Sequence, residues 1–208
     1  MDTTDRTSDA LELSMAGQDA DTIYDLLTSL IVPRPIAWVS TISPSGVRNL
    51  APYSWFTQAS VVPPCVVFTA TGDRDTLANA RSCGEFVVNV VTADFLDAIS
   101  VTAADAPREV DEFTLAGVEA SPAAVVDAPR VAAAPAHLEC RVVQVVPVGD
   151  SHLVVGEVVH AHVAASVRDG VGADCQRLRP VASSSGDRYL GVELLRTVAP
   201  ATWEELDV

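Results

Sequence analysis

The stretch RPIAWVSTISPSGVRNLAPYSWF, residues 34–56, decides the fold. Its first arm carries Ile36, Trp38 and Val39, and β-branched and aromatic residues of this kind suit a pleated, half-buried strand. Residues 43–46 then supply Ser, Pro and Gly, which favour a turn. A second extended run follows. The stretch therefore predicts an antiparallel β-hairpin near the start of the domain.

The returning arm, NLAPYSWF (49–56), is unusual for a strand because it contains Pro52. Proline lacks the N–H that a strand ladder needs, so it is rare in central strands. One interpretation is that pairing stops at Pro52, which frees neighbouring N–H and C=O groups and the Ser54 hydroxyl for a ligand. The other interpretation is an ordinary edge strand with a β-bulge. We favour the first interpretation.

The rest of the chain predicts more strands, joined by turns and short helices. Asp73 or Asp75 is expected to cap the helix that Gly84 ends. Several strands with only short helices between them predict a mainly β, antiparallel barrel or sandwich. The expected elements are a helix from residue 22 to the prolines at 33 and 35, strands at 65–71 and 85–91, helices over 72–84 and 92–103, and a hairpin of 136–148 with 152–165.

Composition narrows the classes of partner. The chain has 208 residues and a net charge of −15, and all thirteen of its basic residues are Arg. Such an acidic protein repels nucleic acid and anionic membranes, so neither is expected as a partner. The chain has no apolar run long enough to span a membrane and no basic, then apolar, leader, so we expect a cytoplasmic protein. We expect a mobile N-terminal arm over 1–20 and a single domain over 21–208.

The common nucleotide-binding and hydrolase motifs are absent from the sequence, as are zinc-type spacings of its four Cys, so no metal site is expected. Instead, the segments RPIAWVST, NLAPYSWF, VFTA, RDTLANARSCGEFVVNVV, DEF and PAHLEC occur in this order. Together they resemble the flavin reductase-like family of FMN-binding split β-barrels, over roughly residues 22–195. That family includes the flavin-reducing components of two-component monooxygenases.

The resemblance implies an antiparallel split β-barrel with short peripheral helices, and a homodimer with FMN at or near the subunit interface. Two departures from the family pattern stand out. Relatives usually carry a Lys where this chain has Arg74, which keeps the positive charge. The stretch SSSGDRY is longer than the usual glycine-rich turn before a Tyr, which leaves the role of Tyr189 undecided.

A flavin phosphate needs hydrogen-bond donors and positive charge. Arg74, Asp75 and Thr76 lie at the predicted N-terminus of a helix, where free N–H groups and the macrodipole favour an anion, and Asn79 follows one turn later. Ordinary capping by Asp75 and Thr76, with Arg74 solvated, is the alternative. With the family pattern beside them, we predict that these residues bind the phosphate.

The flavin ring needs donors and acceptors at its edge and apolar walls at its faces. Extended backbone with small side chains suits the edge. Trp55 and Phe56 are candidate walls, whereas Trp38 is more simply part of the core. The residues predicted to contact the ring edge are Thr41, Asn49, Ala51, Pro52, Tyr53 and Ser54.

The function implied is an FMN-dependent oxidoreductase in which NAD(P)H is a transient co-substrate and delivers hydride to flavin N5. Hydride transfer needs no general acid or base, so no catalytic residue is assigned. Reduced flavin would then reduce a second acceptor or pass to a partner monooxygenase. A non-catalytic FMN-binding or flavin-carrier protein is the alternative. An oxidase for a phosphorylated vitamer ranks low, because this Lys-free chain shows no second cationic cluster.

Three other residues keep two interpretations each. Arg34, between two prolines, is either a salt-bridge partner or a second charge near the cofactor. His160 and His162 share a strand face and either line the site or bind a metal, and we favour a site-lining role for one of them.

Overall fold

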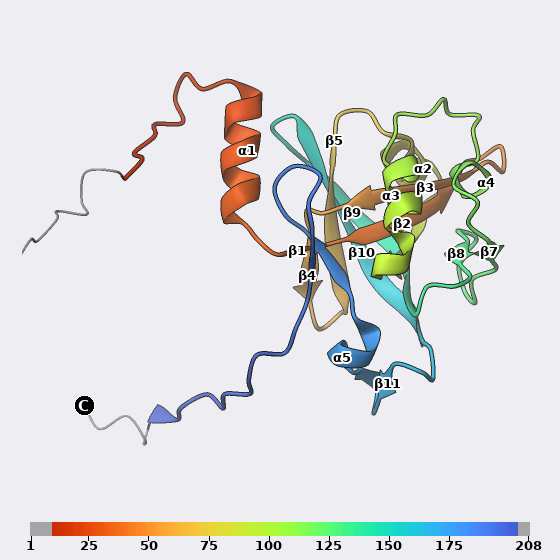
Figure 1. The fold of residues 1–208 in the computed structure, drawn as a ribbon. Coiled ribbons are helices and arrows are strands. Elements are labelled where there is room, and N and C mark those ends of the chain that lie inside the picture. The colour runs from red at the N-terminus through yellow and green to blue at the C-terminus, as the bar shows by residue number, and fades with distance from the viewer. Residues whose placement is uncertain (1–9, 204–208) are drawn as a thin grey trace, which may run out of the picture.

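The computed structural model describes residues 10–203, which form a curved β-structure with short helices around it (Figure 1). The predicted mainly β, antiparallel split-barrel fold is confirmed. In chain order the elements are α1 (Ala20–Leu30), β1 (Arg34–Pro35), β2 (Ala37–Ile42), β3 (Arg48–Tyr53), β4 (Phe56–Ser60), β5 (Cys65–Thr71), α2 (Asp75–Cys83), β6 (Glu85–Val90), a 3₁₀ turn (Ala93–Phe95), α3 (Leu96–Thr102), α4 (Glu112–Leu115), β7 (Ala120–Ser121), β8 (Arg130–Val131), β9 (Ala136–Val148), β10 (Ser151–Val163), β11 (Arg168–Asp169), β12 (Gly172–Ala173), α5 (Cys175–Leu178), β13 (Val181–Ser183) and β14 (Tyr189–Gly191).

The main sheet has seven strands in the order β3-β2-β6-β9-β10-β5-β4. Its outer strands, β3 and β4, follow one another in the chain and are separated only by Ser54 and Trp55. Two residues span only a few ångströms, so the two edges of the sheet must meet at this point. The Thr69 N–H donates to the Trp55 carbonyl at 2.9 Å and continues the β4–β5 ladder through the junction. The sheet therefore closes on itself at Ser54 and Trp55.

Two clusters of apolar side chains fill the two sides of this sheet. The first lies inside the curved sheet and includes Phe68 and Phe86, with Leu77 of α2 packed against them. The second includes Trp38 and Phe113 and lies under α3 and α4. Trp38 is fully buried, and its indole N–H donates to the Thr102 hydroxyl at 2.9 Å. The prediction that Trp38 belongs to the core is thus confirmed.

The predicted break in pairing at Pro52 is wrong. The β2–β3 register runs without interruption from Ala37 opposite Tyr53 to Ile42 opposite Arg48. The Leu50 N–H donates to the Glu112 carboxylate, so it points away from β2. Backbone groups alternate sides along an antiparallel edge strand, so position 52 faces outward as well. Proline is tolerated there because the N–H it lacks would not pair with β2.

The salt-bridge interpretation of Arg34 is wrong, whereas a charge near the cofactor stays a prediction, since Arg34 Nε donates to the Ser54 hydroxyl of the β3–β4 junction at 3.4 Å. It is buried, with 5% of its surface exposed, and it forms no ion pair with a carboxylate among residues 10–203. Its guanidinium donates to the carbonyls of Thr28 and Ile31 at the end of α1, at 2.6 and 3.0 Å. It also donates to the hydroxyl of Ser183, the last residue of β13, at 3.0 Å, and to the carbonyl of the next residue, Ser184, at 2.7 Å. Arg34 therefore ties the first helix to the C-terminal hairpin.

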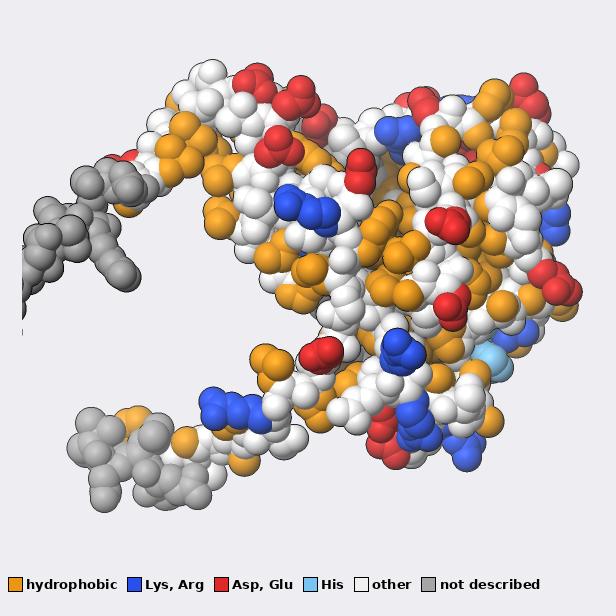
Figure 2. All heavy atoms as spheres, in the orientation of Figure 1, with side chains coloured by type: hydrophobic (Ala, Val, Ile, Leu, Met, Phe, Trp, Pro, Cys, Tyr) orange, Lys and Arg blue, Asp and Glu red, His pale blue; other side chains and the backbone are white. Residues whose placement is uncertain are grey.

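The described residues before α1 and after β14 extend from one side of the molecule (Figure 1). Asp19 caps α1 by accepting the Thr22 N–H at 2.9 Å, and acidic side chains gather over this helix (Figure 2). Residues 1–9 of the predicted N-terminal arm lie outside the described residues, and the mobility of that arm stays a prediction. No helix among residues 10–203 is long and apolar enough to cross a membrane.

We expect Gly156→Ala to lower the free energy of unfolding by roughly 1–3 kcal/mol, because a β-carbon at this position overlaps the Phe86 ring and lies 3.1 Å from Cys140 Cβ. Urea denaturation measures the change. Gly191→Ala is the matched control, since a β-carbon there meets no atom within 4 Å. Equal stability of the two variants would contradict the close packing of β10 on Phe86.

Candidate functional site

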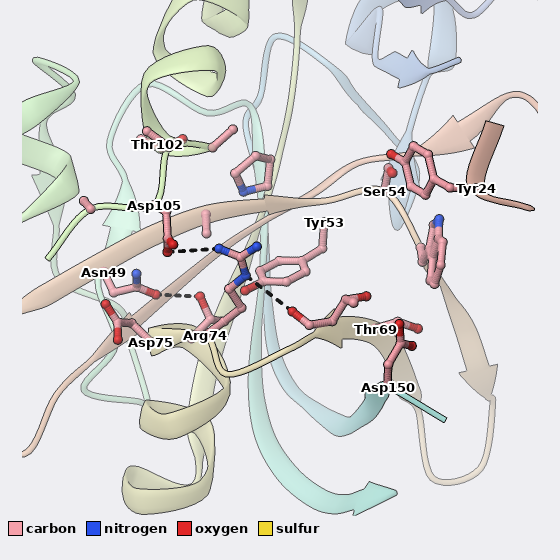
Figure 3. Close-up of a pocket in the computed structure, with 18 of the residues that line it drawn as sticks. Tyr24, Asn49, Tyr53, Ser54, Thr69, Arg74, Asp75, Thr102, Asp105 and Asp150 are labelled. Carbon is pink, nitrogen blue, oxygen red and sulfur yellow. Dashed lines mark hydrogen bonds and ion pairs between the residues drawn. The ribbon is translucent and has the colours of Figure 1, made fainter. Parts of the chain in front are cut away.

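A cleft of about 660 Å³ opens where β3 passes into β4, and it is walled by α1, the N-terminus of α2 and the residues that follow α3. Ligand sites of small molecules and cofactors are commonly of this size. Figure 3 shows Arg74 and Asp105 on one side of it, with Tyr24, Ser54 and Asp150 on the other. Eight of the ten predicted site residues line the cleft, namely Asn49, Ala51, Pro52, Tyr53, Ser54, Arg74, Asp75 and Thr76.

The other two predicted residues, Thr41 and Asn79, are buried behind the cleft wall and contact Asn49 or one another. Asn79 donates to the Thr41 hydroxyl at 3.0 Å, and Thr41 donates to Asn49 Oδ1 at 3.0 Å. Thr76 donates to the same oxygen at 2.7 Å. Thr41 and Asn79 therefore hold Asn49 in place from behind, whereas Asn49 itself lies on the cleft surface.

Glu112 completes this network, and sequence reasoning did not find it. Its Oε1 accepts from Asn49 Nδ2 at 3.0 Å, and its Oε2 accepts the Leu50 N–H at 3.3 Å. The network leaves Asn49 with one unused N–H that can meet a ligand. Three Glu lie in the irregular segment 104–135, and no spacing singles out Glu112; its place in the DEF segment is the signal that could have found it.

The N-terminus of α2 faces the cleft without a side-chain cap. The predicted caps, Asp73 and Asp75, are wrong: Arg74 is the N-cap residue, in extended conformation, and its side chain makes no capping hydrogen bond. Asp75 instead forms an ion pair with Arg108 at 3.0 Å, and Thr76 donates to Asn49. The first-turn N–H groups of α2 are therefore not satisfied by these side chains, which is the arrangement that suits an anion.

Arg74 brings a positive charge to the same end of the cleft. Its guanidinium forms an ion pair with Asp105 at 3.0 Å and donates to the Thr71 carbonyl at 3.3 Å. The Arg74 side chain is 49% exposed and that of Asp105 is 89% exposed, so water screens this pair strongly. An anion in the cleft can therefore compete with Asp105 for the guanidinium.

Aromatic side chains line the middle and the other end of the cleft. Tyr53 packs on Phe68 with ring centroids 4.8 Å apart, and burial raises the pKa of Tyr53 to about 12. Its hydroxyl therefore stays protonated at neutral pH, and it points toward Thr76 and Arg74 (Figure 3). The ring centroids of Trp55 and Tyr24 lie 6.4 Å apart, and the angle between the two ring planes is 30°. Both side chains line the cleft. Phe56, the other candidate wall, packs instead against the core inside the sheet.

The histidines singled out from the sequence lie outside this cleft. His160 is exposed on β10, and His162 Nδ1 lies 3.2 Å from Nδ1 of the buried His137. The expectation that one of them lines the site is therefore not met by this cleft. His160 and His162 do share one face of β10, because the β9–β10 register runs unbroken from His160 opposite Glu139 to His162 opposite His137. Tyr189 lies on the short strand β14, also away from the cleft.

Glu112 should give the protein a measurable dependence of stability on pH. Burial raises the pKa of Glu112 from its ordinary 4.5, so the folded protein keeps this proton to higher pH than the unfolded chain. The Glu112 contribution to the unfolding free energy is therefore full below about pH 4.5 and falls as pH rises through the raised pKa. In Glu112→Gln, which does not titrate, we expect a smaller fall in stability from about pH 4.5 to about pH 7.

Urea denaturation across this pH range checks the expectation. Glu119→Gln is the control because it removes the same charge from an exposed position. A pH dependence of Glu112→Gln identical to that of the natural chain would show that Glu112 contributes nothing to it.

Comparison with known proteins identifies the family. Residues 29–178 match the model of the flavin reductase like domain. A protein of Aquifex aeolicus is 34% identical over 186 residues, covering 86% of this chain and 95% of its own. Nitrilotriacetate monooxygenase component B from Bacillus cereus has a similar structure, with a TM-score of 0.88, 30% identity, and coverage of 91% of this chain and 98% of its own.

A further solved structure, the 2-nitrobenzoate 2-nitroreductase NbaA of Pseudomonas fluorescens, superimposes with a TM-score of 0.81 and 27% identity, over 91% of this chain and 96% of its own. The family model covers well over half of the chain, and the matched range holds every predicted site residue. The cleft at the β3–β4 junction thus lies within a domain of known class. This chain belongs to the flavin reductase like domain family.

Proposed function

We propose that this protein is an NAD(P)H-dependent flavin reductase that holds FMN in the cleft at the β3–β4 junction. One observation carries the proposal. A single cleft combines an anion-binding helix terminus at one end with outward-facing backbone and aromatic rings at the other. FMN is a molecule with a phosphate at one end and a planar, hydrogen-bonding ring at the other, so the residues present fit it.

At the phosphate end, the first-turn N–H groups of α2 and the guanidinium of Arg74 would hold the phosphate. Both the helix terminus and a charged donor stabilise an anion, and a charge-assisted hydrogen bond is about twice as strong as a neutral one. Asp105 would then lose Arg74 as a partner. Because Asp105 is almost fully exposed, water solvates its carboxylate at little cost.

At the ring end, strand β3 would supply the polar contacts. Pro52 lines the cleft, and its carbonyl faces away from β2, so it can accept from the ring edge. Trp55 and Tyr24 would bound the ring face. Bound flavin supplies the hydride-accepting chemistry, and these residues bind and orient it.

The names of the similar structures support a reducing function. One is a component of a monooxygenase and another is a nitroreductase. By analogy, we propose that reduced flavin either reduces an acceptor on the protein or passes to a partner monooxygenase. We also propose a homodimer, which is supported by exposed apolar side chains such as Ile31, at 60% exposure, and Val62, at 89%.

Replacing Arg74 by Ala should weaken FMN binding by roughly 10- to 100-fold and riboflavin binding much less, because only FMN carries the phosphate. Fluorescence titration of each flavin gives the two Kd values. Arg81→Ala, at the opposite end of α2, is the matched control. An equal loss of affinity for both flavins would remove Arg74 from the phosphate site.

The reductase activity itself is tested with the full chain and added FMN. We expect the purified protein to bind FMN with a rise in Tm and to oxidise NADH or NADPH in the presence of flavin, followed by the loss of reduced-nicotinamide absorbance. Binding of FMN raises stability because it favours the folded state. Uptake of FMN without any turnover would identify a flavin carrier and rule out the reductase.

A further inference from the structure

Arg34 is a buried positive charge that no carboxylate neutralises. It is 5% exposed, and within residues 10–203 it forms no ion pair. Its three nitrogens donate to carbonyl and hydroxyl oxygens, all of which are neutral. A guanidinium keeps its charge in proteins, and a buried charge without an opposite charge disfavours folding. The structure therefore holds a full positive charge that no ion pair explains.

One of these hydrogen bonds connects Arg34 to the cleft. Arg34 Nε donates to the Ser54 hydroxyl at 3.4 Å, and Ser54 lines the cleft beside Tyr24 (Figure 3). Within residues 10–203 the Ser54 hydroxyl makes no other hydrogen bond. Because this oxygen accepts from Arg34, its own O–H is free to donate, and the nearby cation makes it a stronger donor. One hydroxyl therefore separates the charge of Arg34 from the cleft, at the end where we place the flavin ring.

Apart from Arg34, the charge at this end of the cleft is negative. Arg74 and Asp105 lie on the opposite side, whereas Asp150 lies on the side of Ser54 (Figure 3). The whole chain carries a net charge of −15. New negative charge in such surroundings is disfavoured by repulsion unless a cation lies close to it. Among residues 10–203, Arg34 is the cation that contacts the cleft wall at this end.

From these contacts we infer that Arg34 is a positioning residue that acts through Ser54 to stabilise the reduced, anionic flavin ring over the oxidised ring. The inference rests on the proposed placement of FMN in this cleft. Hydride transfer carries two electrons and one proton from nicotinamide C4 to flavin N5, and it leaves NAD(P)⁺ and a ring with one negative charge. The charge of Arg34 is fixed in place before that negative charge forms, so it stabilises the product without reorganisation and raises the midpoint potential of bound FMN.

The test measures the midpoint potential of FMN bound to the full chain, by anaerobic titration with dithionite beside an indicator dye. In Arg34→Met the affinity for reduced FMN relative to oxidised FMN should fall roughly tenfold, since one charge about 10 Å away has about this effect at the effective dielectric constant of proteins. For a two-electron couple this lowers the potential by about 30 mV. Arg34→Lys keeps the charge and should recover most of the loss.

Two further variants separate charge from structure. Ser54→Ala leaves the other hydrogen bonds of Arg34 in place and should lower the affinity ratio roughly threefold, because it removes the hydroxyl that the cation polarises. Arg168→Met is the matched control, since it removes the same charge from an exposed residue of β11 outside the cleft. Its potential should equal that of the natural chain.

The pH dependence of the potential reports the charge of the reduced ring. Uptake of one proton with two electrons lowers the potential by about 30 mV for each tenfold fall in proton concentration, and uptake of two protons doubles this slope. We expect the natural chain to show the smaller slope above pH 7. The larger slope there would mean a neutral reduced ring and would overturn the inference.

The remaining outcomes also decide between the proposals. Equal potentials in Arg34→Met and Arg34→Lys overturn the role of the Arg34 charge. If Arg34→Met does not fold, an unchanged potential in Ser54→Ala overturns it instead. If FMN binds but neither NADH nor NADPH is oxidised, the reductase proposal fails, while the dithionite titration still decides the role of Arg34. If FMN does not bind, both proposals fail.

Discussion

The passage of the chain from one edge of the main sheet to the other, through only Ser54 and Trp55, is the constraint on which the cleft depends. Strands β3 and β4 cannot lie apart, so the sheet must curl until its edges meet. Closure at one point leaves the edges free to diverge beyond it. The gap that this leaves beside β3 is the cleft, and α1, α2 and the segment after α3 wall it.

The network around Asn49 turns that gap into a defined surface. It joins β2, β3, α2 and α4 through Thr41, Asn49, Thr76 and Glu112, with Asn79 behind them. Buried polar groups are costly when unpaired, so each member here requires the others. The consequence is a fully hydrogen-bonded wall at the α2 end, in contrast to the exposed aromatic pair of Tyr24 and Trp55 at the other end.

Much of the fold could be predicted from the sequence because its signals are local. The opening hairpin, the strand at 65–71 and the Gly84 end of α2 depend on side-chain pattern and turn chemistry within a few residues. Most of the predicted site residues also come together, since they fall on two adjoining segments. The features that were missed depend on distant contacts. Glu112 meets Asn49 across 63 residues, and Arg34 meets Ser183 across 149.

Pro52 also has a consequence for how copies of this protein meet one another. A strand at the edge of a sheet is a template on which a foreign strand can add, through its free donors and acceptors. On β3 the outward donor of Leu50 is already taken by Glu112, and Pro52 has none. Another chain would therefore find no free donor at two successive outward positions, Leu50 and Pro52, and a regular ladder would be interrupted there. The same edge that borders the cleft thus disfavours aggregation by strand addition.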